Sequence, residues 1–300
     1  MNASQITKLC AWSLGLILFW TTASYGQSTS ISTQQQQNRQ SEILQELAKA
    51  DVVYLGETHS SPEDHQAQLE IIKQLYGRAS QVAIAMEMFQ RPYQQVLDRY
   101  LAGQLSETEL RQQSQYEQRW GFPWEYYAPL LRFAKENHLP VLALNTPKEV
   151  TRKVAREGLE SLTESELRFI PPISEIRTDN AEYRQMLLDA YKQHQAHGST
   201  GNFERFFTAQ VLWDETMAEA IADFIKAKPN YKVVVLAGQG HIVYGYGIPS
   251  RVARRLGIVT GNRRLVQRSV LLSPPEDTPS GKKKPSADFV WQRLDKNAPN

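Results

Sequence analysis

The chain has 300 residues, 41% of them hydrophobic, which is enough to bury a substantial core and excludes an intrinsically disordered protein. Its 34 basic and 32 acidic side chains give a net charge of +2, so no bulk electric field favours a nucleic-acid partner. Cys10 is the only cysteine, so a chain from which the N-terminal segment is removed has none. This excludes disulfides, a thiolate nucleophile, a cysteine zinc site and c-type haem attachment in the processed chain.

Residues 1–26 have the layout of a secretory signal peptide. Lys8 precedes an apolar run of 12 residues, Leu9 to Trp20, and small and polar residues follow it. A membrane-spanning helix needs roughly 20 apolar residues, so a permanent anchor is the weaker interpretation. Cys10 lies too early for a lipid-modified cysteine, which would follow the run. We therefore expect an exported protein, periplasmic or membrane-associated after removal of the signal peptide.

The composition divides the rest of the chain into three parts. Residues 27–40 are mostly Ser, Thr and Gln, which predicts a disordered linker. Residues 41–273 are predicted to form the folded domain, with Ser41 capping a first helix. Residues 274–300 form a tail rich in proline and lysine, in which residues 287–293 are expected to add an edge strand.

Four short apolar runs lie within the predicted domain. Each is too short for a helix, and continuous apolar runs are typical of strands buried on both faces. Because they alternate with longer helical patterns, they predict an α/β fold with a mostly parallel β-sheet flanked by helices. The runs are Asp51 to Leu55, Gln81 to Met86, Pro140 to Leu144 and Lys232 to Ala237. Residues 151–227 contain no comparable run and are predicted to form a helical insertion or subdomain.

Polar residues follow these predicted strands. The carboxyl ends of parallel strands meet at one edge of the sheet, where ligands bind. Glu57 and His59 follow the first strand, Glu87 follows the second, and His241 follows the last. Both histidines occur in a Gly-x-x-His sequence, in which the glycine permits a sharp turn.

These groups allow two interpretations. His59, Glu87 and His241 have the nitrogen and oxygen donors of a zinc or manganese site with an open position, and Glu57 is then a candidate general base. The same groups equally suit a cofactor pocket without a metal. The spacing leaves both open. Asp214, on a predicted helix, is expected to dock that helix and orient a site group.

Several ordered motifs resemble the ChaN-like, iron-regulated, cofacial haem-binding proteins, over about residues 50–260. The resemblance implies an exported haem-binding protein with an axial tyrosine and two haems stacked face to face in a dimer. The wider superfamily that the Gly-x-x-His pair resembles includes the TraB and Tiki proteins and the erythromycin esterases. The motifs are Val53-Tyr54-Leu55-Gly56-Glu57-Thr58-His59, Met86-Glu87-Met88-Phe89, Tyr100-Leu101-Ala102-Gly103, Trp213-Asp214-Glu215-Thr216-Met217-Ala218, Gly238-Gln239-Gly240-His241 and Gly247-Ile248-Pro249.

Haem requires an axial ligand, an apolar wall and basic groups for its propionates. Tyr244, Tyr246 and Arg251 follow His241 and are the best local candidates, although one tyrosine packing in the core is an equal alternative. His194 and His197 form a second cluster, which also suits a helix C-terminus. The aromatic segment from Trp120 to Tyr127 has the composition of a ligand wall, but packing at the start of a helix is the favoured interpretation.

The predicted function is haem binding for iron or haem acquisition, storage or trafficking outside the cytoplasm. The expected partners are haem and a second copy of the chain in a homodimer, with peripheral membrane association and no nucleic acid. The alternative is a metal-dependent hydrolase, a peptidase or esterase, that uses His59, Glu87 and His241 with Glu57 as a further catalytic candidate.

Overall fold

The computed structural model describes residues 22–79, 81–196, 202–257, 259–260, 263–273 and 284–292. Six strands form one sheet in the order β3-β2-β4-β1-β7-β8, and every neighbouring pair is parallel. The predicted α/β fold with a parallel sheet is confirmed. The strands are β1 (Val52–Glu57), β2 (Val82–Gln90), β3 (Val141–Asn145), β4 (Lys232–Gly238), β7 (Gln267–Leu271) and β8 (Phe289–Val290), with a separate antiparallel pair, β5 (Val259–Thr260) and β6 (Arg263–Arg264).

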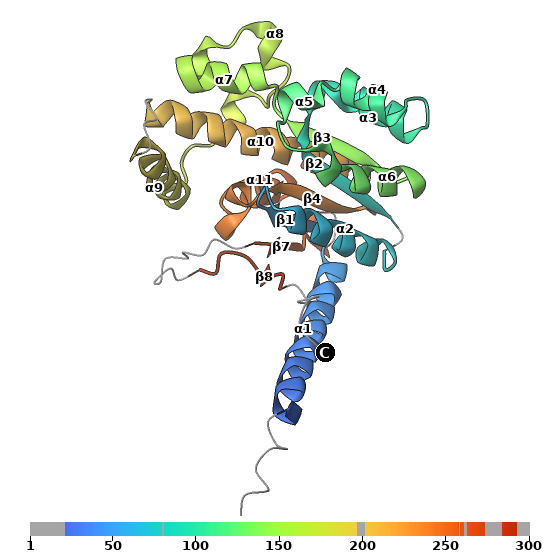
Figure 1. Ribbon diagram of the computed structural model, residues 1–300. Helices are drawn as coiled ribbons and strands as arrows, with labels where there is room; N and C mark the ends of the chain where they lie inside the picture. Colours follow the sequence, from blue (N-terminus) through green and yellow to red (C-terminus); the bar gives the residue numbers. More distant parts are fainter. Residues whose placement is uncertain are drawn as a thin grey trace, which may run out of the picture.

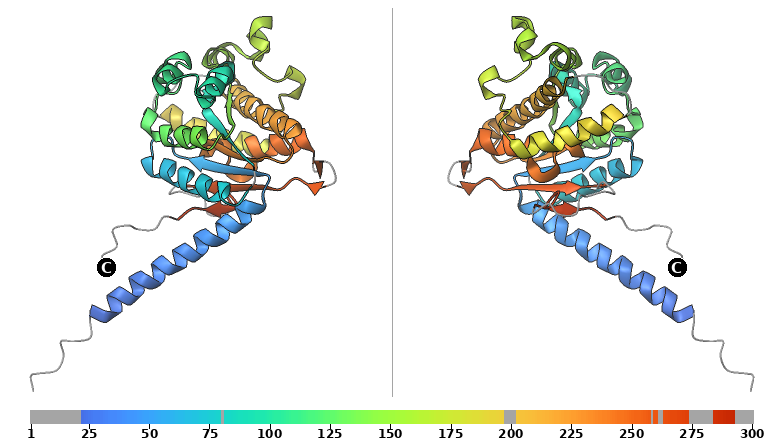
Figure 2. Two further views of the ribbon diagram at one scale, coloured as in Figure 1. Left: turned by 90° about the vertical axis from the view of Figure 1, so that its right-hand side faces the viewer. Right: turned by 90° about the vertical axis from the view of Figure 1, so that its left-hand side faces the viewer.

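Helices cover both faces of the sheet (Figure 1). Helices α2 and α6 pack on one face and α10 and α11 on the other, so that the sheet lies between them (Figure 2). The helices are α1 (Thr22–Lys49), α2 (Pro62–Tyr76), α3 (Gln94–Leu101), α4 (Glu107–Gln113), α5 (Tyr116–Arg119), α6 (Ala128–Glu136), α7 (Lys148–Glu157), α8 (Glu164–Leu167), α9 (Ala181–Ala196), α10 (Phe203–Ala227) and α11 (Ile248–Leu256).

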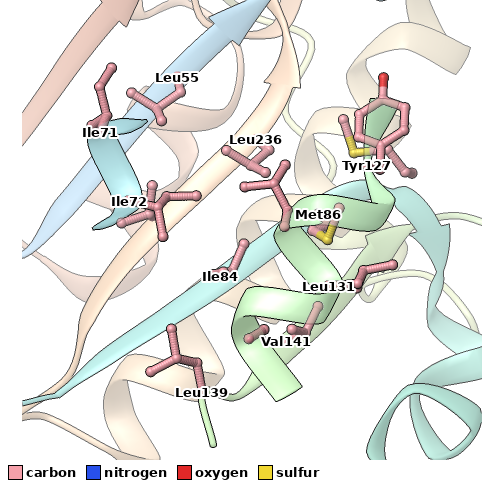
Figure 3. Packing of buried hydrophobic residues seen from close by; sticks show 14 of the residues in the cluster. Leu55, Ile71, Ile72, Ile84, Met86, Tyr127, Leu131, Leu139, Val141 and Leu236 are labelled. Atoms are coloured by element: carbon pink, nitrogen blue, oxygen red, sulfur yellow. The ribbon is translucent and has the colours of Figure 1, made fainter. Parts of the chain in front are cut away.

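Strands β1, β2, β3 and β4 are buried on both faces because their side chains alternate between two apolar layers. Leu55, Ile84 and Leu236 pack with α2 and α6 in the core drawn in Figure 3. Tyr54 and Val235, one position away, pack on the opposite face beneath α10 and α11. Each fully buried aliphatic side chain contributes about 1.5–3 kcal/mol, which explains why these strands read as continuous apolar runs.

The register of the strands brings their carboxyl ends level with one another. Glu57 at the end of β1 lies opposite Gly238 at the end of β4, and Met86 of β2 lies opposite Leu236. Strand β2 then loses its regular register with β3 between Met86 and Gln90, which is where Glu87 lies. Such irregularities re-aim side chains, and here one places Glu87 against the end of β4.

The N-terminal helix differs from the sequence prediction. Residues 27–40, predicted as a disordered linker, lie within α1, and Ser41 lies inside that helix instead of capping it. Only the C-terminal part of α1 packs on the domain, through Ile43, Leu44 and Leu47, and the rest projects outward (Figure 2). A helix anchored at one end extends with one hydrogen bond per added residue, so polar residues without proline continue it. Among the residues that the structure describes, no helix is long and apolar enough to cross a membrane.

The segment predicted as a helical insertion divides into two parts. Helix α10 packs Met217 and Ile221 against the sheet, so it is the crossover helix between β3 and β4. Helices α7, α8 and α9 are the additional elements. In the C-terminal tail, β8 pairs with β7 where the sequence places a last edge strand, and Trp291 is buried after it.

One buried lysine also joins the end of α1 to the sheet. Lys232 Nζ of β4 donates to the carbonyl oxygens of Leu47, at 3.0 Å, and of Ala48 and Ala50, where α1 ends. The last carbonyl groups of a helix have no intrahelical partner, and a cation there also complements the helix dipole.

We expect Lys232→Met to lower the free energy of unfolding by about 1.5–3 kcal/mol, the usual contribution of a charged hydrogen bond. Urea titration followed by tryptophan fluorescence measures the change. Lys228→Met, at an exposed position nearby, is the matched control and should have little effect. A loss no larger than that of the control would contradict the assigned role of Lys232.

Candidate functional site

The carboxyl end of the sheet brings together the four residues that the sequence placed there. Glu57, Glu87 and His241 are buried, with exposed fractions of 1%, 4% and 6%. The side chain of His59 is 29% exposed, so it is the member of the group that solvent or a ligand reaches. Gly238 makes the close packing possible, because a Cβ atom there would lie 2.9 Å from the imidazole ring of His59.

His59 is held by a buried carboxylate. Its Nδ1 lies 2.7 Å from Glu57 Oε1, and the same oxygen accepts a 2.5 Å hydrogen bond from the Tyr127 hydroxyl. Gln68 Nε2 donates to the other oxygen, also at 2.5 Å. Because both oxygens are bonded, the carboxylate is fixed and orients the imidazole. His65 of α2 contacts the turn after β1, with its Nε2 3.1 Å from the carbonyl oxygen of His59.

Aromatic rings form one wall beside His59. Its ring centroid lies 4.9 Å from that of Trp120 and 5.0 Å from that of Phe122. These rings come from the aromatic segment for which the sequence favoured packing at a helix start. The segment does pack, since Trp124 and Tyr127 are buried, but Trp120, Phe122 and Tyr127 also contact the Glu57–His59 pair.

The second half of the site is built around Glu87. Glu87 Oε2 accepts a 2.8 Å hydrogen bond from the backbone N–H of Gly238, and Oε1 lies 3.5 Å from His241 Nε2. His241 Nδ1 lies 2.7 Å from Asp214 Oδ1, so the imidazole is held between two carboxylates. The expectation that Asp214 orients a site group agrees with this contact.

Asp214 is itself positioned by α9, one of the additional helices. The Tyr183 hydroxyl of α9 donates to Asp214 Oδ2, and Gln210 Nε2 lies 3.3 Å from His241 Nδ1. The neighbouring Glu215 forms ion pairs with Arg251, Arg254 and Arg255 of α11. These contacts fix α10 and α11 together beside the strand ends.

The charges of the site follow from these contacts. Burial lowers the pKa of His241, but the carboxylates of Glu87 and Asp214 outweigh it and raise the pKa to about 10. Burial raises the pKa of Glu87, but the imidazoles of His241 and His59 and the N–H of Gly238 lower it to about 2. Glu87 and His241 therefore form an ion pair at neutral pH.

His59 has a smaller shift in the same direction. Burial lowers its pKa, while the hydrogen bond to Glu57 and the charge of Glu87 raise it above the ordinary value of 6.5. Burial, together with the nearby Glu57 carboxylate, raises the pKa of the Tyr127 hydroxyl, so Tyr127 remains a proton donor to Glu57.

The predicted metal site is assembled only in part. His59, Glu87 and His241 lie together, yet across the ranges with described coordinates no group of three His, Cys, Asp or Glu side chains is arranged to hold a metal ion. Both nitrogens of His241 face carboxylates, and Nδ1 of His59 faces Glu57.

The candidate haem-binding residues that the sequence suggested do not all lie in one site. Tyr244 and Tyr246 follow the strand-end site, with ring centroids 5.5 Å apart, and Tyr246 packs beside Tyr183. Arg251 is 3% exposed and donates to the carbonyl oxygens of Tyr246 and Gly247, so here it belongs to the buried α11 network. The side chain of His194 and the whole of His197 lie outside the described residues.

Sequence reasoning missed part of the hydrogen-bond network. Gln68 and Tyr183 carry no local signal, because each lies in an ordinary helical pattern and reaches its carboxylate only through the fold. Tyr127 had a signal in the aromatic segment, whose composition alone does not show that its hydroxyl reaches Glu57.

Comparisons with known proteins agree with this architecture. A family model described as "Haem-binding uptake, Tiki superfamily, ChaN" matches residues 43–252. Protein RETICULATA-RELATED 5, chloroplastic, of Arabidopsis thaliana is 28% identical over 267 residues, which are 83% of this chain and 35% of that protein. The chain thus spans about a third of the length of this relative.

One solved structure shares the fold, and another is more distantly similar. A structure titled "Cofacial heme binding to ChaN of Campylobacter jejuni" matches with a TM-score of 0.61 at 20% identity, covering 83% of this chain and 90% of that chain. A mutant of the erythromycin esterase EreC gives a TM-score of 0.45 at 14% identity, covering 83% and 78% of the two chains. The resemblance to ChaN-like proteins drawn from the motifs is confirmed.

The ion pair of Glu87 and His241 predicts how stability depends on pH. The pKa of His241 is about 10 in the folded protein against 6.5 ordinarily, so its contribution is full below pH 6.5 and is lost as pH rises towards 10. The pKa of Glu87 is about 2 against 4.5, so its contribution is full above pH 4.5 and is lost as pH falls towards 2. We expect this pair to stabilise the fold most between pH 4.5 and 6.5.

Urea unfolding at about pH 6 and about pH 9 tests the alkaline side. His241→Gln should destabilise the protein more at the lower pH than at the higher one. His138→Gln, at an exposed position, serves as the control and should change little at either pH. An equal loss for His241→Gln at both values would show that the imidazole is not charged in the folded state.

Proposed function

Because the chain belongs to the ChaN family of haem-binding uptake proteins, in the Tiki superfamily, we propose that it binds haem. The observation that carries the proposal is the family match over residues 43–252, which includes both Gly-x-x-His turns and the Tyr244–Tyr246 segment. The fold shared with ChaN of Campylobacter jejuni supports it.

The donors that haem requires are present near Tyr244. A phenolate oxygen is a ligand of ferric iron in haem proteins, and cationic side chains bind the propionates. Tyr244 lines a cavity together with Arg268 and Lys284, and Lys284 also lies over the ring of Tyr246, 5.4 Å from its centroid. The types of side chain suit the group: a tyrosine would hold the iron, and Arg268 would pair with a propionate. When bound, haem would supply a ferric iron that accepts the tyrosine oxygen as an axial ligand.

The cellular role is part of the proposal. An exported protein that binds haem serves iron or haem acquisition, storage or trafficking, and residues 1–26 have the sequence layout of an export signal. A homodimer around stacked haems and peripheral association with a membrane complete the proposed role.

Haemin titration tests the binding. We expect the full chain to give a saturable Soret band with a high-spin ferric spectrum, as phenolate ligation produces. Tyr244→Phe or Tyr246→Phe removes only the hydroxyl, so the substitution at the axial position should abolish that spectrum while the ring still packs. Tyr76→Phe, at an exposed tyrosine on α2, is the control. Unchanged spectra in both variants would place the ligand elsewhere, with His194 and His197 next.

A second candidate function rests on the Glu57–His59 pair. A partly exposed imidazole held at 2.7 Å by a buried carboxylate has the arrangement of a general base. In hydrolysis, neutral His59 would take a proton from water, the resulting hydroxide would attack a carbonyl carbon, and the proton would return to the leaving group. The protonated ring would be stabilised by Glu57. This proposal keeps the predicted hydrolase and assigns its base to His59.

The two candidate functions respond differently to the same variant. If the site is hydrolytic, His59→Gln should reduce cleavage of a nitrophenyl ester by at least about a hundredfold, the usual contribution of a general base. If the protein only binds haem on tyrosine, His59→Gln should keep the Soret band, and affinity should fall by about 1–3 kcal/mol at most. Ester cleavage that is equal in the wild type and in His59→Gln would end the hydrolytic candidate. Repeating the assay with a chelator tests the metal-dependent form.

A further inference from the structure

A C-terminal segment lies across the tyrosines that we propose as haem ligands. This segment, residues 284–291, which we name the strap, falls outside the family match, which ends at residue 252. The carbonyl oxygen of Ser286 in the strap accepts a 2.7 Å hydrogen bond from the backbone N–H of Tyr244. Lys284 lies over the ring of Tyr246. The strap therefore contacts both candidate ligands.

A cavity of about 180 Å³ is lined by Tyr244 and by Ser286 and Ala287 of the strap. A cavity of about 150 Å³ holds a single benzene ring, and pockets for drug-sized molecules run from about 300 to 1,000 Å³. A porphyrin, with its linked pyrrole rings and its propionates, exceeds this space. With the strap in place, Tyr244 is 9% exposed, so it offers a porphyrin little accessible surface.

The strap is held mainly at its C-terminal end. Its strand, β8, pairs with β7 through Phe289 and Val290. Trp291 is 3% exposed in the core, and its backbone N–H donates to the carbonyl oxygen of Leu271 at 2.9 Å. Asp288 accepts hydrogen bonds from the backbone N–H and the hydroxyl of Ser269 at 2.7 and 2.8 Å. Residues 284–288 lie before this anchored end, and such a segment opens at a small fraction of the free energy that unfolds the whole domain.

Tyr244 is also in an unusual backbone conformation. Its φ of 57° lies in the left-handed region, which residues other than glycine rarely adopt. The hydrogen bond to Ser286 supports that conformation, so release of the strap frees both the ring surface and the backbone of Tyr244.

We infer that the strap, residues 284–291, is a gate that must leave Tyr244 before haem binds there. This inference rests on the proposed haem-binding function and adds its regulation. The measured affinity for haem is then the intrinsic affinity reduced by the fraction of molecules whose strap is open.

A reversible lock tests the gate. Ser269 and Asp288 are neighbours on paired strands, and adjacent strands lie about 4.8 Å apart, within the range of Cα separations that a disulfide spans. Ser269→Cys with Asp288→Cys in a Cys10→Ser background therefore allows one bond that fixes the strap to β7. The oxidised protein is compared with the same protein reduced and alkylated, in which the bond cannot re-form and no thiol is free to bind iron.

We expect the alkylated form to bind haemin at least about tenfold more tightly than the oxidised form, with a Soret band lost in Tyr244→Phe. Circular dichroism shows that both forms are folded, and Ser269→Cys alone, alkylated in the same way, controls for the chemical treatment. Equal, tyrosine-dependent binding by the oxidised and alkylated forms would overturn the gate and leave haem binding intact. Absence of saturable binding in every form, including the wild type, would overturn the proposed function and the gate with it.

Discussion

The arrangement at the carboxyl end of the sheet depends on the Glu87 carboxylate. It accepts the N–H of Gly238 and faces the His241 imidazole, so it joins the ends of β2 and β4. Because the group is buried, its charge is stable only with these partners, and their loss would leave an unpaired buried charge. His59 packs against Gly238. Asp214 of α10 bonds Nδ1 of His241, the nitrogen that does not face Glu87, and so brings α10 to the strand ends.

This constraint joins the site to the distant helices. Asp214 lies on α10, and its second oxygen is bonded by Tyr183 of α9, so the additional helices support the strand-end site. Glu215, the next residue, pairs with arginines of α11, which begins just after Tyr244 and Tyr246. The strand-end histidines and the candidate haem tyrosines are thus joined by one network of contacts through α10 and α11.

The two proposed activities use different surfaces of this network. The Glu57–His59 pair is preorganised for proton transfer, with a fixed carboxylate and an imidazole that solvent reaches. The tyrosines lie beyond His241 beneath the strap, where Arg268 and Lys284 supply positive charge. The strap contacts both tyrosines, so the two proposed activities concern different residues and can be tested separately.

The sequence by itself determined the parallel α/β fold, four of the six strands of the main sheet and the residues at their ends, because strands buried on both faces leave continuous apolar runs and each motif is local. It did not determine α1, where polar composition predicted a linker and the fold anchors a helix. Only the tertiary structure decided that Tyr127, Gln68 and Tyr183 bond the site carboxylates, and that the tail covers Tyr244. These contacts join residues far apart in the chain, so no local pattern records them.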